Sequence, residues 1–303
     1  MLNYILLLVG FVLLIKGSDI FVGASSAIAR KFNISPIIIG LTITAIGTSS
    51  PEAMVSITSS LRGMNDMSIA NVVGSNIFNL LVVLGVASMF SKLRISNYKD
   101  VVTLLGTCIL LLLCVLDGDL SLLNGITLLI SFGYFMFNMI KNAKNNEEAV
   151  EEKVNKPLWL TIILGLLGLG AIIYGGDLVV DMASSIALQL GMSENLVALT
   201  ICSIGTSLPE FVTSIMATRK GELDIAIGNV LGSNIFNILL ILGCASVINP
   251  MTVSTVALID VIFMAITVVL FVLVTYKNKV ISKKTGIPMV ILYVMYIVMT
   301  IIR

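Results

Sequence analysis

The sequence predicts an all-α integral membrane protein of ten transmembrane helices, arranged as two inverted five-helix repeats. Its 303 residues are 57% hydrophobic and only 12% charged, and the mean hydropathy is +1.07. So apolar a chain needs lipid as the solvent for most of its surface. Apolar runs of about 20 residues, the length that crosses a bilayer, recur along the chain, and one long segment occurs twice.

Ten apolar runs are predicted to span the membrane. They cover residues 2–25, 35–61, 67–90, 100–116, 120–140, 157–187, 194–218, 223–248, 251–275 and 286–302. Fifteen of the eighteen Lys and Arg residues fall in alternate loops between these runs. Because cationic loops are retained in the cytoplasm, both termini are expected outside the cell.

The first apolar run could be mistaken for a secretory signal, since the small-x-small triplet Ala27-Ile28-Ala29 follows it. Lys16 and Asp19 interrupt the run, and no basic segment precedes it. The run also has a full counterpart later in the chain. We therefore expect it to be retained as the first span.

An internal repeat organises the whole chain. A shift of 158 residues aligns Gly10–Gly85 with Gly168–Gly243 without a gap, and 34 of the 76 pairs are identical. Each half holds five predicted spans, and an odd number places the second copy upside down in the membrane. Inverted repeats of this kind are typical of secondary transporters, whose substrate site lies near the bilayer midplane between the repeats.

The repeat divides the chain into three predicted parts. The first repeat is 1–141, with its characteristic segment at about 40–80; a polar cytoplasmic linker is 142–156; the second repeat is 157–303, with its segment at about 198–238. The linker is too short for a soluble domain.

The most informative duplicated motif places a carboxylate after a helix break. Gly47-Thr48-Ser49-Ser50-Pro51-Glu52 returns as Gly205-Thr206-Ser207-Leu208-Pro209-Glu210. Proline interrupts the helical hydrogen-bond ladder, so carbonyls around Thr44, Ala45, Thr48, Cys202, Ser203 and Thr206 are predicted to turn inward. Each glutamate begins the next half-helix, where the helix dipole favours an ionised carboxylate. Ionisable residues at this depth generally bind something.

A second duplicated motif, Gly-Ser-Asn-Ile-Phe-Asn, supplies the facing wall. Ser75 and Asn79 share one helical face, as do Ser233 and Asn237. Gly74 and Gly232 are predicted to let the neighbouring helix approach closely. Carboxylate, hydroxyl, amide and carbonyl oxygens suit Ca²⁺ and Na⁺. The chain has no histidine, and its four cysteines show no paired spacing, which disfavours disulfides and soft-metal sites.

These two motifs resemble the two alpha-repeats of the sodium/calcium exchangers, within the calcium/cation antiporter superfamily, and the resemblance extends over the ten predicted helices. It implies that the chain is of the prokaryotic type that consists of the alpha-repeats alone. In that family the two glutamates ligate Ca²⁺ and share the Na⁺ sites, which corresponds to Glu52 and Glu210. The resemblance also implies carbonyl ligands at Thr48, Thr206, Ala45 and Ser203, and Na⁺ sites lined by Ser49, Ser75, Ser207 and Ser233.

The resemblance also bears on the coupling ion. Potassium-dependent relatives, and some archaeal ones, carry Asp at the position of Asn237. The Asn at both 79 and 237 therefore resembles the potassium-independent animal exchangers more closely, and this resemblance implies exchange that does not require K⁺. Proton-coupled relatives use an acidic and histidine-containing pattern that this chain lacks. A proton/calcium exchanger nevertheless remains the alternative, because the glutamates themselves can titrate.

Several residues have a structural interpretation beside the functional one. Glu52 and Glu210 could pair with buried donors, but Lys16 is the sole cation within these spans. Asn79 and Asn237 could ligate directly or support the ligands from behind. Asp19 and Asp177 could mark an ion entrance, although a packing role is favoured. Asp66 and Asp224 are predicted to open helices as N-terminal anions.

The predicted function is therefore an antiporter rather than an enzyme. Ca²⁺ and Na⁺ are its expected substrates and the bilayer its surroundings, with no cofactor, nucleic acid or obligate protein partner. A cation channel is the alternative within transport, with the glutamates as a selectivity ring. An intramembrane enzyme is disfavoured, because neither Ser49 nor Ser207 has an activating base in view.

Overall fold

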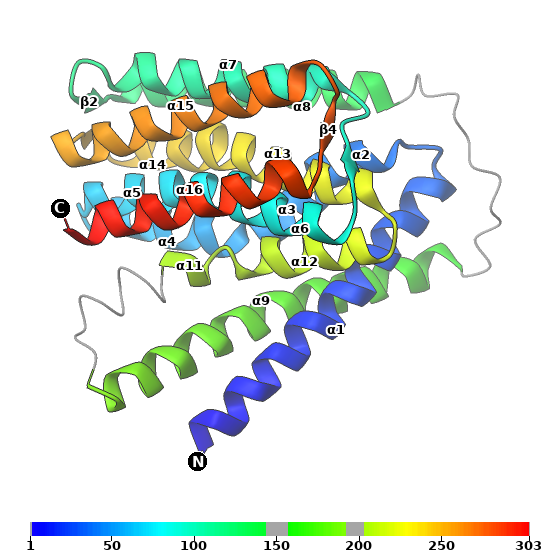
Figure 1. Cartoon of the computed structure of the whole chain (residues 1–303). Coiled ribbons are helices and arrows are strands. Elements are labelled where there is room, and N and C mark those ends of the chain that lie inside the picture. The colour runs from blue at the N-terminus through cyan, green and yellow to red at the C-terminus, as the bar shows by residue number, and fades with distance from the viewer. Residues whose placement is uncertain (1, 144–156, 192–202, 303) are drawn as a thin grey trace.

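The computed structural model describes residues 2–143, 157–191 and 203–302, and these form a helical bundle (Figure 1). The first half contains α1 Leu2–Lys31, α2 Pro36–Ile39, η1 Gly40–Thr44, α3 Ala45–Thr48, α4 Ser50–Leu61, α5 Asn65–Phe78, η2 Asn79–Val83, α6 Leu84–Phe90, β1 Leu93–Arg94, α7 Tyr98–Val115, β2 Asp119–Leu120 and α8 Leu122–Ala143. The second half contains α9 Leu158–Gln189, α11 Ser203–Gly205, α12 Leu208–Arg219, α13 Leu223–Phe236, η4 Asn237–Leu242, α14 Gly243–Ile248, β3 Met251–Thr252, α15 Thr255–Tyr276, β4 Val280–Ile281 and α16 Lys283–Ile302.

Eight helices in the described ranges are long and apolar enough to span a membrane, or nine if a bent pair counts as one more. That pair is Pro36–Thr48 with Ser50–Leu61, bent by 51°. The ten predicted spans are therefore matched by eight or nine, because part of the predicted span 194–218 lies outside the described residues. The predicted break between Gly47 and Pro51 occurs at a single residue, Ser49, which separates α3 from α4.

Two continuous spans, each built from three elements, form the centre of the bundle. Asn65–Phe90 and Leu223–Ile248 each have 78% of their most apolar window buried, against 33% for α1 and 22% for α9. Both contain a π-helical stretch, η2 and η4, whose first residues are Asn79 and Asn237. π-helical stretches inside α-helices occur frequently at functional sites. The sequence patterns do not predict these stretches.

The helices α1 and α9 cross closely at the periphery (Figure 1). An ideal Cβ on Gly17 would lie 2.8 Å from the Gly168 carbonyl oxygen, and one on Gly175 would lie 2.9 Å from that of Gly10. Gly10 and Gly17 are the repeat equivalents of Gly168 and Gly175. This reciprocal contact shows that the two helices run antiparallel, as an inverted repeat requires.

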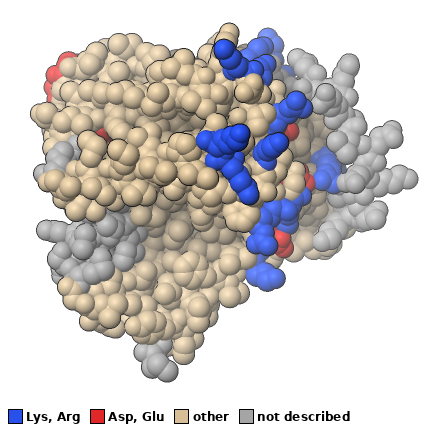
Figure 2. All heavy atoms as spheres, in the orientation of Figure 1, with Lys and Arg blue, Asp and Glu red and all other residues tan. Residues whose placement is uncertain are grey.

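Two short antiparallel strand pairs join loops of opposite halves. β1 pairs with β4, and β2 pairs with β3. The loops predicted to be cytoplasmic around 92–99 and 277–284 thus share one end of the molecule, and the loops around 119 and 251 share the other. Figure 2 shows Lys and Arg gathered toward one end of the visible face, the end at which β4 lies in Figure 1.

Candidate functional site

The two glutamates lie where the repeats meet. Glu52 is in the first turn of α4 and Glu210 in the first turn of α12, and both are fully buried. Pro51 and Pro209 occupy the helix starts, where the missing N–H is not needed and the fixed φ angle suits the helix. The sequence therefore places each carboxylate at the positive end of a helix dipole.

Each carboxylate is held by a serine of the opposite half. Ser49 Oγ donates to Glu210 Oε1 at 2.8 Å, and Ser207 Oγ donates to Glu52 Oε1 at 3.0 Å. Ser233 Oγ makes a longer contact of 3.4 Å with Glu210 Oε1. Because the two short bonds cross between the repeats, neither glutamate is positioned by its own half alone.

The second oxygen of each carboxylate has no hydrogen-bond partner among the described residues. Four more atoms of the predicted site share this condition: Ser75 Oγ, Asn79 Oδ1, Asn79 Nδ2 and Asn237 Oδ1. All these side chains are essentially inaccessible to solvent. A buried polar atom without a partner costs about 1–3 kcal/mol, so such a group of oxygens indicates that something else binds them.

The predicted amide ligands differ from one another. Asn237 Nδ2 donates to Asn76 Oδ1 at 3.1 Å, which orients its own oxygen. Asn79 makes no side-chain hydrogen bond to any described residue. Asn76 and Asn234 each donate to the other's backbone carbonyl, at 3.1 and 3.2 Å, and so bind α5 to α13 behind the site.

Sequence reasoning missed two residues that brace both glutamate helices. Asn71 Nδ2 donates to the Glu52 carbonyl at 3.2 Å, and its oxygen accepts from Thr206 Oγ1 at 3.4 Å. Asn229 repeats this arrangement, with bonds of 3.4 Å to the Glu210 carbonyl and 3.1 Å from Thr48 Oγ1. Their identity across the repeat was visible in the sequence, but their partners are distant in the chain.

The predicted backbone ligands are described only in part. Thr48 Oγ1 lies 3.1 Å from both the Thr44 carbonyl and Asn229 Oδ1 and shares its single proton between them, while the carbonyl of Ala45 accepts from the Ser49 N–H at 2.9 Å. These two carbonyls, which the sequence predicts to turn inward, therefore still have hydrogen-bond partners within their own helix, because the helix continues through them to Thr48. A carbonyl has two lone pairs, so both oxygens retain the capacity to bind a cation. Cys202 lies outside the described residues.

Ser203 begins α11, and its side chain is not described. Of the two predicted close-approach glycines, Gly232 is confirmed. An ideal Cβ there would lie 2.6 Å from both Cα and O of Leu41. Gly74 meets no described atom within 4 Å, and residue 199, the repeat equivalent of Leu41, is outside the described ranges.

The other duplicated acidic residues differ from the glutamates in being partly or fully exposed. Asp66 and Asp224 are in the first turns of α5 and α13, which confirms the predicted helix-opening position. Asp19 forms an ion pair with Lys220 at 2.9 Å, and Asp177 is exposed.

The site's chemistry suits hard cations. Two carboxylates, serine hydroxyls and amide oxygens converge there, and no histidine or cysteine of the described residues is among these groups. A shell of mostly neutral oxygens around two negative charges matches the preferences of Ca²⁺ and Na⁺ rather than those of thiophilic metals.

Comparison with known proteins is consistent with this chemistry. A sequence profile described as sodium/calcium exchanger protein matches residues 2–141 and 159–302. The chain is 31% identical to the sodium/calcium exchanger MaX1 of Methanosarcina acetivorans over 98% of this chain and 97% of that one. It is 35% identical to the inner membrane protein YrbG of Escherichia coli over 81% and 79%.

A solved structure is similar over nearly the whole length. The sodium-calcium exchanger NCX_Mj, soaked with 2.5 mM Na⁺ and 1 mM Sr²⁺, superposes with a TM-score of 0.88 at 34% identity, covering 98% of both chains.

Proposed function

The chain belongs to the sodium/calcium exchanger family, and we propose that it exchanges Na⁺ for Ca²⁺ by alternating access, without requiring K⁺. Family and fold make it a multi-pass membrane antiporter of the cation/Ca²⁺ class. The choice of Na⁺ as coupling ion is our proposal. The observation that supports cation exchange at this site is the pair of buried glutamates. Each is held by a serine of the opposite half, and each has one oxygen without a partner among the described residues.

The charge of this pair explains why exchange would be obligatory. Two ionised carboxylates carry a charge of about −2, which one Ca²⁺ neutralises, whereas Na⁺ ions would occupy separate oxygen clusters around the same pair. An unneutralised pair in a low-dielectric interior is strongly disfavoured. A protein that changes state only with a neutralised site must carry one cation in each direction.

We assign the ligand roles accordingly. Glu52 and Glu210 hold Ca²⁺ and take part in Na⁺ binding. The flanking oxygens come from Ser49, Ser75, Ser207, Ser233, Asn79 and Asn237, with carbonyls from Thr48, Thr206, Ala45 and Ser203. The unpartnered oxygens of Ser75, Asn79 and Asn237 favour a direct role for these three side chains.

Reconstituted vesicles test the proposal. Radioactive Ca²⁺ uptake is measured with a Na⁺, a K⁺ or an H⁺ gradient imposed one at a time. We expect uptake driven by the Na⁺ gradient alone, with no additional requirement for K⁺. Uptake driven by the pH gradient would make the protein a proton/calcium exchanger, and uptake that persists without any counter-ion would make it a channel.

We also propose that the end carrying β1 and β4 faces the cytoplasm, since the cationic loops gather there (Figure 2). Single cysteines introduced beside Lys279 and beside Asp119 and labelled in intact cells with an impermeant reagent test this orientation. Labelling beside Lys279 rather than Asp119 would reverse it.

A further inference from the structure

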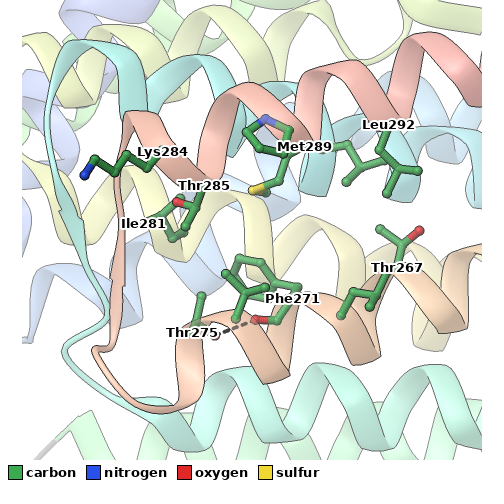
Figure 3. Close-up of a pocket in the computed structure, with 12 residues that line it drawn as sticks. Thr267, Phe271, Thr275, Ile281, Lys284, Thr285, Met289 and Leu292 are labelled. Atoms are coloured by element: carbon green, nitrogen blue, oxygen red, sulfur yellow. Dashed lines mark hydrogen bonds between the residues drawn. The ribbon is translucent and has the colours of Figure 1, made fainter.

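A cavity of about 270 Å³ opens between α15 and α16, and neither glutamate is among its lining residues (Figure 3). Thr267, Phe271 and Thr275 of α15 line one side, and Lys284 and Met289 of α16 line the other. Its inner wall includes Leu81, a residue of η2 two positions after Asn79. The cavity thus reaches from the lipid-facing surface to the helix that presents a predicted ion ligand.

The cavity's polar side chains are turned to their own backbone. Thr267 Oγ1 donates to the Phe263 carbonyl at 2.8 Å and Thr275 Oγ1 to the Phe271 carbonyl at 2.7 Å. Thr285, a further lining residue, donates to the Ser282 carbonyl at 2.8 Å. The walls therefore offer hydrocarbon rather than hydrogen bonds, and an apolar cavity is a poor site for water.

Lys284 provides the one cationic group of the lining. It is exposed in the first turn of α16, at the end where β4 lies. In Figure 3 its ammonium group points away from the cavity, toward that end of the molecule, while its alkyl stem lies at the mouth. Such a side chain covers apolar surface with its stem and keeps its charge at the interface.

We propose that this cavity binds one acyl chain of an anionic phospholipid, with the lipid phosphate against Lys284. The apolar walls match the chain, and the ammonium at the mouth matches the headgroup, since polybasic ends of membrane proteins attract anionic lipid. The volume is slightly below the range of pockets that enclose a whole drug-sized ligand, which suits a single chain. A chain that reaches Leu81 packs against η2 and supports the geometry of Asn79.

The test measures lipid retention first and transport second. Protein is purified from vesicles of phosphatidylcholine containing phosphatidylglycerol, and the bound phosphatidylglycerol is measured by native mass spectrometry. We expect Lys284→Gln to retain several-fold less, while Lys283→Gln, a neighbouring lysine outside the cavity lining, retains as much as the unaltered protein. Equal retention by the two variants would overturn the proposal.

A second pair of variants separates the chain from the headgroup. Leu270→Trp fills this cavity, and Leu110→Trp fills a cavity of about 290 Å³ between α7 and α8 whose lining holds no Lys or Arg. We expect Leu270→Trp alone to lose phosphatidylglycerol, together with any stimulation of exchange by that lipid. Retention by Leu270→Trp would place the lipid elsewhere.

An independent observation concerns ion pairs between α1 and the α12–α13 turn. Lys220 pairs with Asp19 at 2.9 Å and Arg30 with Glu222 at 2.8 Å. By the 158-residue shift, Asp19 corresponds to Asp177 and Lys220 to Arg62, so the equivalents of the first pair are again one acidic and one basic residue. Within the described part of the chain no ion pair joins those two equivalents.

In the described structure, one of these two equivalent ion pairs is therefore formed and the other is not. In transporters built from inverted repeats, one repeat or bundle rocks against the other around a fixed site, so that the two sides of the site open in turn. We infer that Asp177 and Arg62 pair in the opposite state, as Asp19 and Lys220 separate. The Arg30–Glu222 pair has no counterpart, since the equivalent residues are Leu188 and Met64. It biases the protein toward the state described here.

Crosslinking tests this inference, which rests on the alternating-access mechanism proposed above. In a cysteine-free background, Asp19→Cys with Lys220→Cys forms one pair, and Asp177→Cys with Arg62→Cys the other. We expect the two crosslinking yields to change in opposite directions when Na⁺ replaces Ca²⁺. Yields that rise and fall together would overturn the inference that the two ion pairs alternate. Absence of Na⁺-driven flux in the vesicle assay would instead overturn the proposed function.

A further pair of variants tests whether the Arg30–Glu222 ion pair favours the state described here. Arg30→Leu, which copies the other repeat, is expected to raise the yield of the Asp177–Arg62 cysteine pair several-fold. Lys31→Leu, one residue along the same helix and outside the ion pair, is expected to leave it unchanged. Identical yields in both variants would remove the role assigned to the Arg30–Glu222 pair.

Discussion

Replacement of Ser49 by alanine tests whether the crossed serine bonds set cation affinity. The Ser49 hydroxyl donates to Glu210 Oε1 at 2.8 Å, and both residues are fully buried. A hydrogen bond to a charged group contributes about 1.5–3 kcal/mol, and full burial leaves it unscreened by solvent. Since 1.4 kcal/mol corresponds to a tenfold change in affinity, we expect Ser49→Ala to raise the half-saturating Ca²⁺ concentration by about 10- to 100-fold.

The neighbouring serine provides a matched control. Ser50 Oγ donates to the Ile46 carbonyl of its own helix, and its repeat equivalent is Leu208, so this position needs no hydroxyl. We expect Ser50→Ala to bind Ca²⁺ as the unaltered protein does. Affinity is measured by Ca²⁺ uptake in vesicles at a fixed Na⁺ gradient, with thermal stability in detergent as the folding check. A Ser49→Ala protein that matches Ser50→Ala in affinity would refute the reasoning.

Three further predictions concern charge and packing. Glu52→Gln and Glu210→Gln should each abolish Ca²⁺ flux while leaving a monodisperse protein on gel filtration, and normal exchange by both variants would remove the ligand assignment. Asn237→Asp adds a negative charge to the site and should alter the Na⁺ and K⁺ dependence of flux; an unchanged dependence would show that Asn237 only supports the ligands. Gly17→Leu forces the α1–α9 contact apart and should destabilise the protein by about 1–3 kcal/mol, whereas Gly170→Leu, which meets open space in the described structure, should leave the thermal midpoint unchanged.

The sequence predicted the central architecture because many equivalent positions of the two repeats carry identical residues. Thirty-four of 76 aligned positions agree, and the inversion follows from counting spans. The position of both glutamates at helix starts follows from Pro51 and Pro209, since proline acts on its own neighbourhood in the chain. Local chemistry of this kind can be derived without a structure.

The π-helical stretches and the bracing asparagines could not be predicted in the same way. A π stretch has no local sequence pattern comparable to a cap or a proline break, and it begins at Asn79 and at Asn237 inside otherwise continuous apolar runs. Asn71 joins Glu52 to Thr206, and Thr206 is 135 residues from Asn71 in the chain. The geometry that makes such a bond possible exists only after the two halves have packed.

The crossed bonds constrain how the protein can move. Each glutamate accepts its short serine bond from the other half, and α5 is tied to α13 through the exchanged amide bonds of Asn76 and Asn234. Separation of α4 and α5 from α12 and α13 would break all of these bonds at once in a buried place, where each unpaired group is costly. The peripheral helices α1 and α9 are largely lipid-exposed, and α1 contacts the α12–α13 turn through surface ion pairs that cost little to break. We therefore expect the ion site to stay assembled through the cycle while α1 and α9 shift across it.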